Sequence, residues 1–351
     1  MQAAAQVLGV SVDTLLGTEA AGPAPAVTLD AMRDLLAARD AEQRKHRRLW
    51  GLLGAAAPQL VMLAAMGLAV GSQIAGLYYA ERLLELPLGL IGACLGMASL
   101  PRLSRLAGEK DFAAFRRDMA LALRWATLLS LPAAAGLWAV GPCLVDVLLH
   151  HGEFDATGVR QVTLALWAYL PCLPACAVSR CLLAGCNALG DVRLTALSSL
   201  LAVVFTLAGG AWLLHSMARD IYFCLPAAAA SAALWGQTVW LWRGLRRRLR
   251  PLLPAPALLD GMACLRHVLA AGAAAAAALV VLRLCGMVCP LQELLSVVPV
   301  LLPGLPAMAG LALSIGAGCC AWGSALVLLG DADTRMLAHK LRTKLQGDSR
   351  S

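Results

Sequence analysis

Residues 49–80 form a run of 32 residues without one charged side chain. About 20 consecutive apolar residues suffice to cross the hydrocarbon core of a bilayer. The rest of the chain agrees with this run, because 60% of all residues are hydrophobic and 14% are charged, against about 25% charged in ordinary soluble domains. The sequence therefore predicts a protein that crosses the membrane several times.

The chain contains eight apolar stretches that meet or approach this length. They are approximately Leu49–Leu77, Leu86–Leu103, Met119–Val140, Val162–Leu183, Leu194–Leu214, Ile221–Trp242, Met262–Val281 and Leu305–Leu329. Each stretch has a length typical of one membrane-spanning helix. We therefore expect an all-α polytopic membrane protein with about eight transmembrane helices.

Charged and proline-rich segments divide the chain into five predicted parts. They are a cytoplasmic leader at 1–48 that contains an amphipathic basic helix, a six-helix transmembrane lobe at 49–243, a basic and proline-rich cytoplasmic linker at 244–261, a unit of two helices at 262–330, and a basic cytoplasmic tail at 331–351. The leader helix, Val27–Arg48, is predicted from its apolar residues at helical spacing.

Lysine and arginine side chains concentrate in alternate loops. They are frequent at the end of the leader, after the second and sixth stretches and in the tail, whereas the other loops contain few of them. Because loops rich in Lys and Arg stay in the cytoplasm, both termini are predicted to be cytoplasmic. The net charge of +8 comes from these short runs, so we do not expect the membrane part to bind nucleic acid.

Three charges beside the first apolar run form the main candidate for a binding site. Glu81, Arg82 and Glu85 follow the aromatic pair Tyr78 and Tyr79. The two glutamates share a helix face, and Arg82 is within ion-pair reach of Glu85. Charges beside a membrane span are costly, so Arg82 is a candidate for binding an anionic headgroup, with the glutamates tuning it or accepting protons. The alternative is a structural ion pair at the water interface.

Arg180 is the second candidate, because it lies in the otherwise uncharged stretch Gln161–Gly190. Its side chain could enter a polar cavity or extend to the cytoplasmic surface. Four cysteines in the same region follow approximately helical spacing, which favours close helix packing over metal or redox use. These cysteines are Cys172, Cys176, Cys181 and Cys186.

Motifs of catalysis are missing from the sequence. It contains no nucleotide-binding glycine loop, no zinc-protease helix and no serine-nucleophile elbow. None of its twelve cysteines forms a CxxC pair. We therefore predict no catalytic residue, no cofactor and no bound metal ion.

Three blocks of sequence contain motifs that occur in a fixed order along the chain. In the first, a tyrosine pair, an acidic residue and an arginine precede an acidic residue and a proline. The residues that match across the three blocks are Tyr78, Tyr79, Glu81, Arg82, Glu85 and Pro87; Pro142, Leu148, Leu149, Gly152 and Phe154; and Arg180, Asp191 and Arg193. The chain thereby resembles the MurJ/MviN lipid II flippase family of the MOP flippase superfamily. The resemblance covers only the carboxyl-terminal lobe and the last two helices of that family.

The resemblance implies a lipid II flippase, not an enzyme, that acts by alternating access in peptidoglycan biosynthesis at the bacterial inner membrane. The implied substrate is a lipid-linked diphosphate, and the implied headgroup site comprises Arg82, Glu81, Glu85 and Arg180. Residues 262–330 would form a groove for the polyprenyl tail, among membrane lipids. Because the first lobe is absent, we expect a partner lobe or a second copy of the chain.

Two departures from the family pattern keep other functions open. Cys186 and Asn187 stand where the family has an aromatic pair, and Glu81 stands where aspartate is common. One alternative is a polysaccharide-lipid or multidrug transporter of the same superfamily. Another is a non-transporting membrane protein whose leader binds a partner or DNA.

Overall fold

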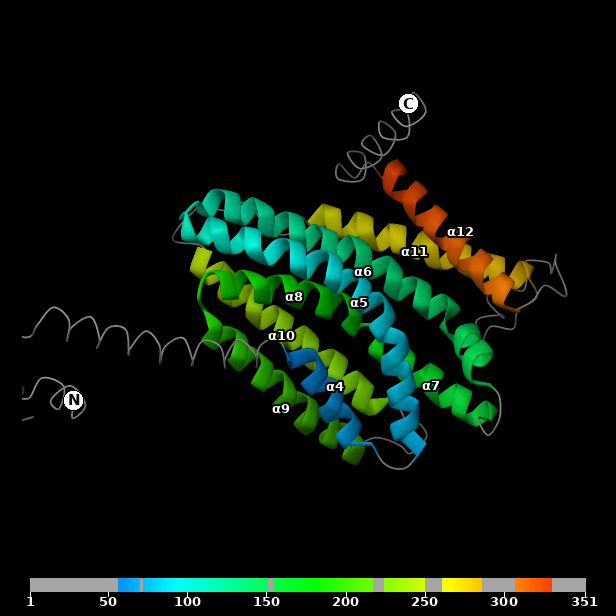
Figure 1. Ribbon diagram of the computed structural model, residues 1–351. Coiled ribbons are helices and arrows are strands. Elements are labelled where there is room, and N and C mark those ends of the chain that lie inside the picture. The colour runs from blue at the N-terminus through cyan, green and yellow to red at the C-terminus, as the bar shows by residue number, and fades with distance from the viewer. Residues whose placement is uncertain are drawn as a thin grey trace, which may run out of the picture. The chain divides into compact units, whose positions relative to one another are not determined.

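The structure is a computed structural model that describes residues 56–69, 72–150, 155–216, 224–249, 261–285 and 307–329. Every regular element in these ranges is an α-helix (Figure 1). The helices are α4 (Ala57–Gly67), α5 (Ser72–Gly108), α6 (Phe112–Leu149), α7 (Ala156–Tyr169), α8 (Cys172–Ala188), α9 (Val192–Ser216), α10 (Leu225–Leu249), α11 (Gly261–Leu284) and α12 (Ala307–Leu328). All of them belong to the unit Leu53–Ser351, one of two into which the chain divides. The predicted leader and basic tail lie outside the described residues.

Four helices of the described part are long and apolar enough to cross a membrane, namely α6, α9, α11 and α12. Helices α7 and α8 add a fifth span if the two are counted together. Each of the eight predicted stretches contains a helix, with α7 and α8 sharing one stretch. The prediction of an all-α polytopic membrane protein is confirmed.

The boundary between the first two spans differs from the prediction. The charged cluster was expected between two helices, but α5 runs without interruption from Ser72 to Gly108. The break lies earlier, where α4 ends at Gly67. Residues 80–86 are all Ala, Leu, Glu or Arg, which are strong helix formers. An ion pair between Arg82 and Glu85 adds support within one turn, so the charges lie inside a helix.

The fourth predicted span is interrupted. The prediction treated Val162–Leu183 as one helix, whereas the structure has α7 and α8, which meet at an angle of 41°. Pro171 lies between them. Proline has no backbone N–H, so the Trp167 carbonyl lacks the partner that it would have in a continuous helix, and the chain bends there.

Helix α5 changes direction near its middle (Figure 1). Pro87 lies in this part of the helix. Its missing N–H leaves the carbonyl of Leu83 without the usual partner four residues on, and its ring presses against that carbonyl. Sharp bends in helices commonly have this cause.

Helix α8 lies at the centre of the six-span lobe. It contacts α5, α6 and α10, and all its residues except Arg180, Asn187 and Ala188 are buried. Small apolar residues on every side make this burial possible. The four cysteines at helical spacing are buried and not disulfide-bonded, as expected for residues that serve packing.

Helices α11 and α12 pack against each other and against α6. Alanines supply the contact face of α11, and Gly318 of α12 approaches its backbone so closely that a Cβ there would lie 3.2 Å from the Ala274 carbonyl oxygen. A buried hydrogen bond of 3.1 Å joins Thr127 Oγ1 of α6 to His267 Nδ1 of α11. The last two helices are thus attached to the lobe through α6.

Two turns in the lobe share one backbone pattern. Lys110 between α5 and α6 has a φ of 57°, and Gly190 between α8 and α9 has a φ of 76°. After each, an aspartate N–H donates to the carbonyl five residues earlier, from Asp111 to Leu106 (3.1 Å) and from Asp191 to Cys186 (2.9 Å). This is the Schellman ending of a helix, which requires a left-handed residue.

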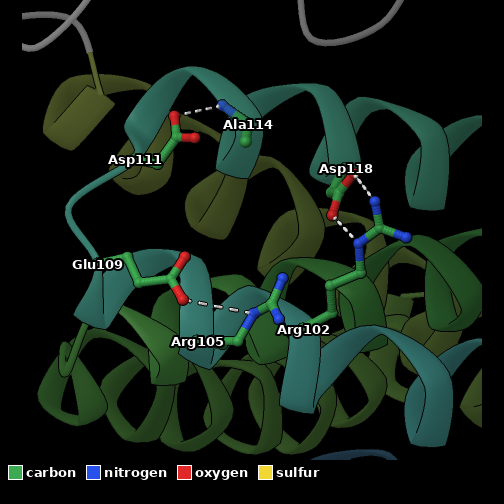
Figure 2. A network of polar contacts seen from close by, with 6 residues as sticks. All are labelled: Arg102, Arg105, Glu109, Asp111, Ala114 and Asp118. Atoms are coloured by element: carbon green, nitrogen blue, oxygen red, sulfur yellow. Dashed lines mark hydrogen bonds and ion pairs between the residues drawn. The ribbon is translucent and has the colours of Figure 1, made fainter.

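Ion pairs surround these turns. Arg102 of α5 makes a two-point contact with Asp118 of α6, and Arg105 pairs with Glu109 at 3.6 Å (Figure 2). The Asp111 carboxylate accepts a hydrogen bond of 3.0 Å from the Ala114 N–H, which caps α6 (Figure 2). The turn between α5 and α6 is therefore fixed by both backbone and side-chain contacts.

Lys110→Gly is expected to stabilise the protein by about 1 kcal/mol, because glycine adopts the left-handed conformation without the steric cost of a Cβ. The matched change Gly190→Ala should destabilise it by a similar amount. Thermal unfolding in detergent, followed by circular dichroism, measures both. A Lys110→Gly protein that unfolds at a lower temperature than the original would contradict the assignment of strain to this turn.

Candidate functional site

A polar pocket of about 280 Å³ lies between α4, α5 and α8. Its lining residues are Gln59, Met62, Glu81, Leu84, Glu85, Leu88, Gly89 and Arg180. Helical spacing explains the set, since residues 81, 84, 85 and 88 of α5 share one face. The pocket thus gathers charged side chains from two helices that are distant in sequence.

Arg82 is held by its neighbours on α5. Its Nη1 donates to Glu85 Oε2 at 2.6 Å, and its guanidinium carbon lies 5.0 Å from the centre of the Tyr78 ring. The side chains of Arg82 and Glu85 remain 57% and 43% exposed. An ion pair this accessible contributes little to stability, so both groups can exchange partners at low cost.

Glu81 differs from Glu85 in its surroundings. It is partly buried, and within the described part of the chain it makes no ion pair. Burying a carboxylate without a partner is unfavourable. Glu81 is therefore the acidic group in the pocket that would gain most from a bound proton or cation.

Arg180 reaches the pocket from α8. Its Nη1 donates a hydrogen bond of 3.1 Å to the backbone carbonyl of Leu88 on α5. Of the two orientations that the sequence left open, the structure has the one in which Arg180 lines a polar pocket. The guanidinium keeps further N–H groups for other acceptors.

The structure brings together three of the four predicted site residues. Glu81, Glu85 and Arg180 line the pocket, whereas Arg82 lies beside it, attached to Glu85. Two lining residues, Gln59 and Met62 of α4, were not predicted. Gln59 could have been noticed as one of the few amide side chains in the first uncharged run, but Met62 gives no such signal.

A second, apolar cavity of about 450 Å³ lies between α5, α6, α11 and α12. It is lined by Pro87, Leu129, Pro132, Ala133, Gly136, Leu137, Val140, Leu144, Ala274, Ala278, Ser314, Ile315, Gly318, Cys319 and Trp322. Small residues on α11 and α12 leave this space open. Helices α11 and α12 supply only part of its lining, because α6 contributes Leu129, Pro132, Ala133, Gly136, Leu137, Val140 and Leu144. A tail groove formed by residues 262–330 stays a prediction.

Helix α5 separates the two cavities at its bend. Pro87 lines the apolar cavity, while Glu85, Leu88 and Gly89 line the polar pocket. Helical positions advance by about 100° per residue, so Pro87, which is two positions from both Glu85 and Gly89, points away from these two pocket-lining residues. The same turn of α5 therefore borders both spaces.

Comparisons with known proteins point to one family. A family model described as lipid II flippase MurJ matches residues 29–303. A probable lipid II flippase MurJ from Vibrio cholerae is 37% identical over 122 residues, covering 34% of this chain and 23% of that protein. Another from Rhizobium tropici is 29% identical over 220 residues, covering 58% of this chain and 40% of that protein. A solved structure of lipid II flippase MurJ in an inward closed conformation has a TM-score of 0.58 at 16% identity, covering 81% of this chain and 53% of that one.

The helical fold and its four or five apolar spans define a multi-pass membrane protein. The family model covers more than half of the chain, and the chain spans about half or less of the length of these relatives. The chain belongs to the MurJ lipid II flippase family. Membership in this family makes it a protein of the inner membrane.

Proposed function

We propose that this chain acts as the carboxyl-terminal lobe of a lipid II flippase, which moves the undecaprenyl-diphosphate-linked peptidoglycan precursor across the membrane by alternating access. One observation carries the proposal: a polar pocket and an apolar cavity lie on two sides of one turn of α5. An amphiphile with a charged headgroup and a long apolar tail matches this pairing. Arg82, Glu81, Glu85 and Arg180 are proposed to handle the headgroup.

The apolar cavity suits the polyprenyl tail. The cavity walls are formed almost entirely by apolar side chains, so a tail that leaves the bilayer for the cavity stays in apolar surroundings and gains van der Waals contacts. The nearly continuous apolar face would let a chain of isoprene units lie along α11 and α12. We therefore assign residues 262–330 to tail binding, next to the six-helix lobe at 49–243.

The charge balance of the polar pocket indicates that a second lobe takes part. Glu81, Glu85 and Arg180 line the pocket, and Arg82 lies beside it in an ion pair with Glu85, so two positive charges accompany two negative ones. A diphosphate needs an excess of positive charge to be held firmly. Further cations must come from another part of the complete transporter, either a separate first lobe or a second copy of the chain.

The proposed orientation places both termini in the cytoplasm. The arginine-rich ends of α5 and α10 then lie on the cytoplasmic side, as the distribution of basic residues favours. The basic linker at 244–261, the leader at 1–48 and the tail at 331–351 would lie on that side too.

The test is complementation in cells depleted of their own lipid II flippase. We expect rescue when this chain is produced together with the amino-terminal half of a full-length relative, and none when either is produced alone. Insertion of each protein in the membrane is checked by immunoblotting of membrane fractions. Rescue by this chain alone would instead support a cavity formed by two copies.

The proposal would be contradicted if this chain inserted stably in the membrane but rescued growth neither alone nor together with the amino-terminal half. Polysaccharide-lipid or drug transport would then be examined by accumulation assays. Deleting residues 1–26 provides a further control, because a transporter lobe should keep its rescue activity without them. Loss of rescue on that deletion would favour the reading in which the leader binds a partner or DNA.

A further inference from the structure

Arg180 connects α8 to the bend of α5. Pro87 interrupts the hydrogen-bond ladder of α5, and the Arg180 guanidinium donates to the carbonyl of Leu88, the next residue along the chain. A helix is least rigid where its ladder is interrupted. The contact therefore acts on the part of α5 that bends most easily.

The polar pocket spans this bend. Glu81, Leu84 and Glu85 precede Pro87, and Leu88 and Gly89 follow it. A ligand in the pocket would thus touch the segments of α5 before and after Pro87. It would also touch the Arg180 guanidinium, which is bonded to the segment after Pro87. The apolar cavity borders the same bend from the other side, through Pro87 itself.

The current partner of Arg180 is a weak one. A backbone carbonyl is a neutral acceptor, whereas a phosphate offers charged oxygens in a geometry that suits both arms of a guanidinium. A phosphate that accepts from both arms of the guanidinium, Nη1 included, would therefore displace the Leu88 carbonyl as the acceptor for Arg180. The second segment of α5 would then lose its tie to α8.

We propose that Arg180 is a positioning residue that couples headgroup binding to the bend of α5: a bound phosphate takes the guanidinium from the Leu88 carbonyl, frees the bend at Pro87, and so alters the apolar cavity on the other face. This inference rests on the proposed function, since it takes a lipid-linked phosphate as ligand. It adds a specific route by which the headgroup pocket communicates with the tail cavity.

Amide hydrogen exchange in the full chain, reconstituted in lipid nanodiscs together with the amino-terminal half of a full-length relative, tests this coupling. Undecaprenyl diphosphate is the probe, and its binding is followed separately by tryptophan fluorescence. With the probe bound, exchange in peptides covering residues 83–91 should become about tenfold faster, as expected for the loss of one charge-assisted hydrogen bond. Unchanged or slower exchange there, with binding shown, overturns the inference while leaving the proposed function intact.

Two variants separate coupling from a purely structural role. Arg180→Gln should show fast exchange at the bend before the probe is added and no further change afterwards. Arg180→Lys should keep the response, because an ammonium group can also move from carbonyl to phosphate. A response that persists in Arg180→Gln would overturn the proposal.

Arg193→Gln is the matched control, because Arg193 is an exposed arginine that does not line the pocket. Its exchange response should equal that of the original chain. If the original chain fails to bind the probe at all, both the proposed function and this inference are contradicted. The binding measurement thus tests the proposed function, and the exchange measurement tests the coupling through Arg180.

Discussion

Cys319→Trp should weaken tail binding and impair the proposed growth rescue while the protein still folds and inserts. Cys319 of α12 lines the apolar cavity but is itself exposed, so a large ring can enter the cavity without disturbing the packed core. The ring would fill space that the tail would otherwise occupy. Loss of about ten contacts between heavy atoms, at roughly 0.1–0.2 kcal/mol each, should weaken binding about tenfold. Binding of a fluorescent polyprenyl diphosphate and growth rescue both measure this loss.

The neighbouring residue provides a close control. Cys320 is also an exposed cysteine of α12, but it does not line the cavity. Cys320→Trp should therefore bind the tail as the original chain does and rescue growth. If both variants lost tail binding equally, a large side chain anywhere on this part of α12 would be harmful. If Cys319→Trp bound the tail and rescued growth fully, the cavity would not be the binding site of the tail.

Arg82→Ala should weaken binding of the lipid-linked diphosphate by roughly thirtyfold, or about 2 kcal/mol. Two effects add. The variant loses a charged donor for the headgroup, and it leaves Glu85, its partner at 2.6 Å, as an uncompensated carboxylate in the pocket. Because this carboxylate repels the diphosphate, Arg82→Ala should lower the affinity by more than the loss of one contact would.

A second variant separates these two effects. Arg82→Ala combined with Glu85→Ala restores the charge balance of the pocket, so binding should recover to within about fivefold of the original. Titration calorimetry with this chain and a complementary amino-terminal lobe gives both affinities. Substrate binding that is unchanged in Arg82→Ala would show that the ion pair serves structure alone.

Much of the fold could be predicted because apolar runs are long and uninterrupted in this sequence. All eight stretches contain helix, since burial in lipid depends on composition more than on precise contacts. The boundaries of the helices were harder to predict. The charged segment before Leu86 continues as helix because its residues are strong helix formers, and Pro171 divides a stretch that hydropathy alone presents as one.

The candidate site could be predicted in part. Isolated charges in apolar surroundings identified Glu81, Glu85 and Arg180, which the structure brings to one pocket. The contact between Arg180 and the Leu88 carbonyl could not be predicted, because it depends on how α8 packs against α5. The position of Met62 in the pocket could not be predicted either. Met62 is an ordinary apolar residue, and only the fold places it there.

The fixed turn between α5 and α6 has a mechanical consequence. Arg102 and Asp118 anchor the carboxyl-terminal half of α5, so a change of angle at Pro87 falls on the other half. The segment from Ser72 to Pro87, 15 helical steps of about 1.5 Å each, forms a lever about 22 Å long. A rotation of about 10° at Pro87 would move the free end by about 4 Å and carry the tyrosine pair with it. α5 thereby converts a small local rearrangement into a displacement comparable to the width of a side chain.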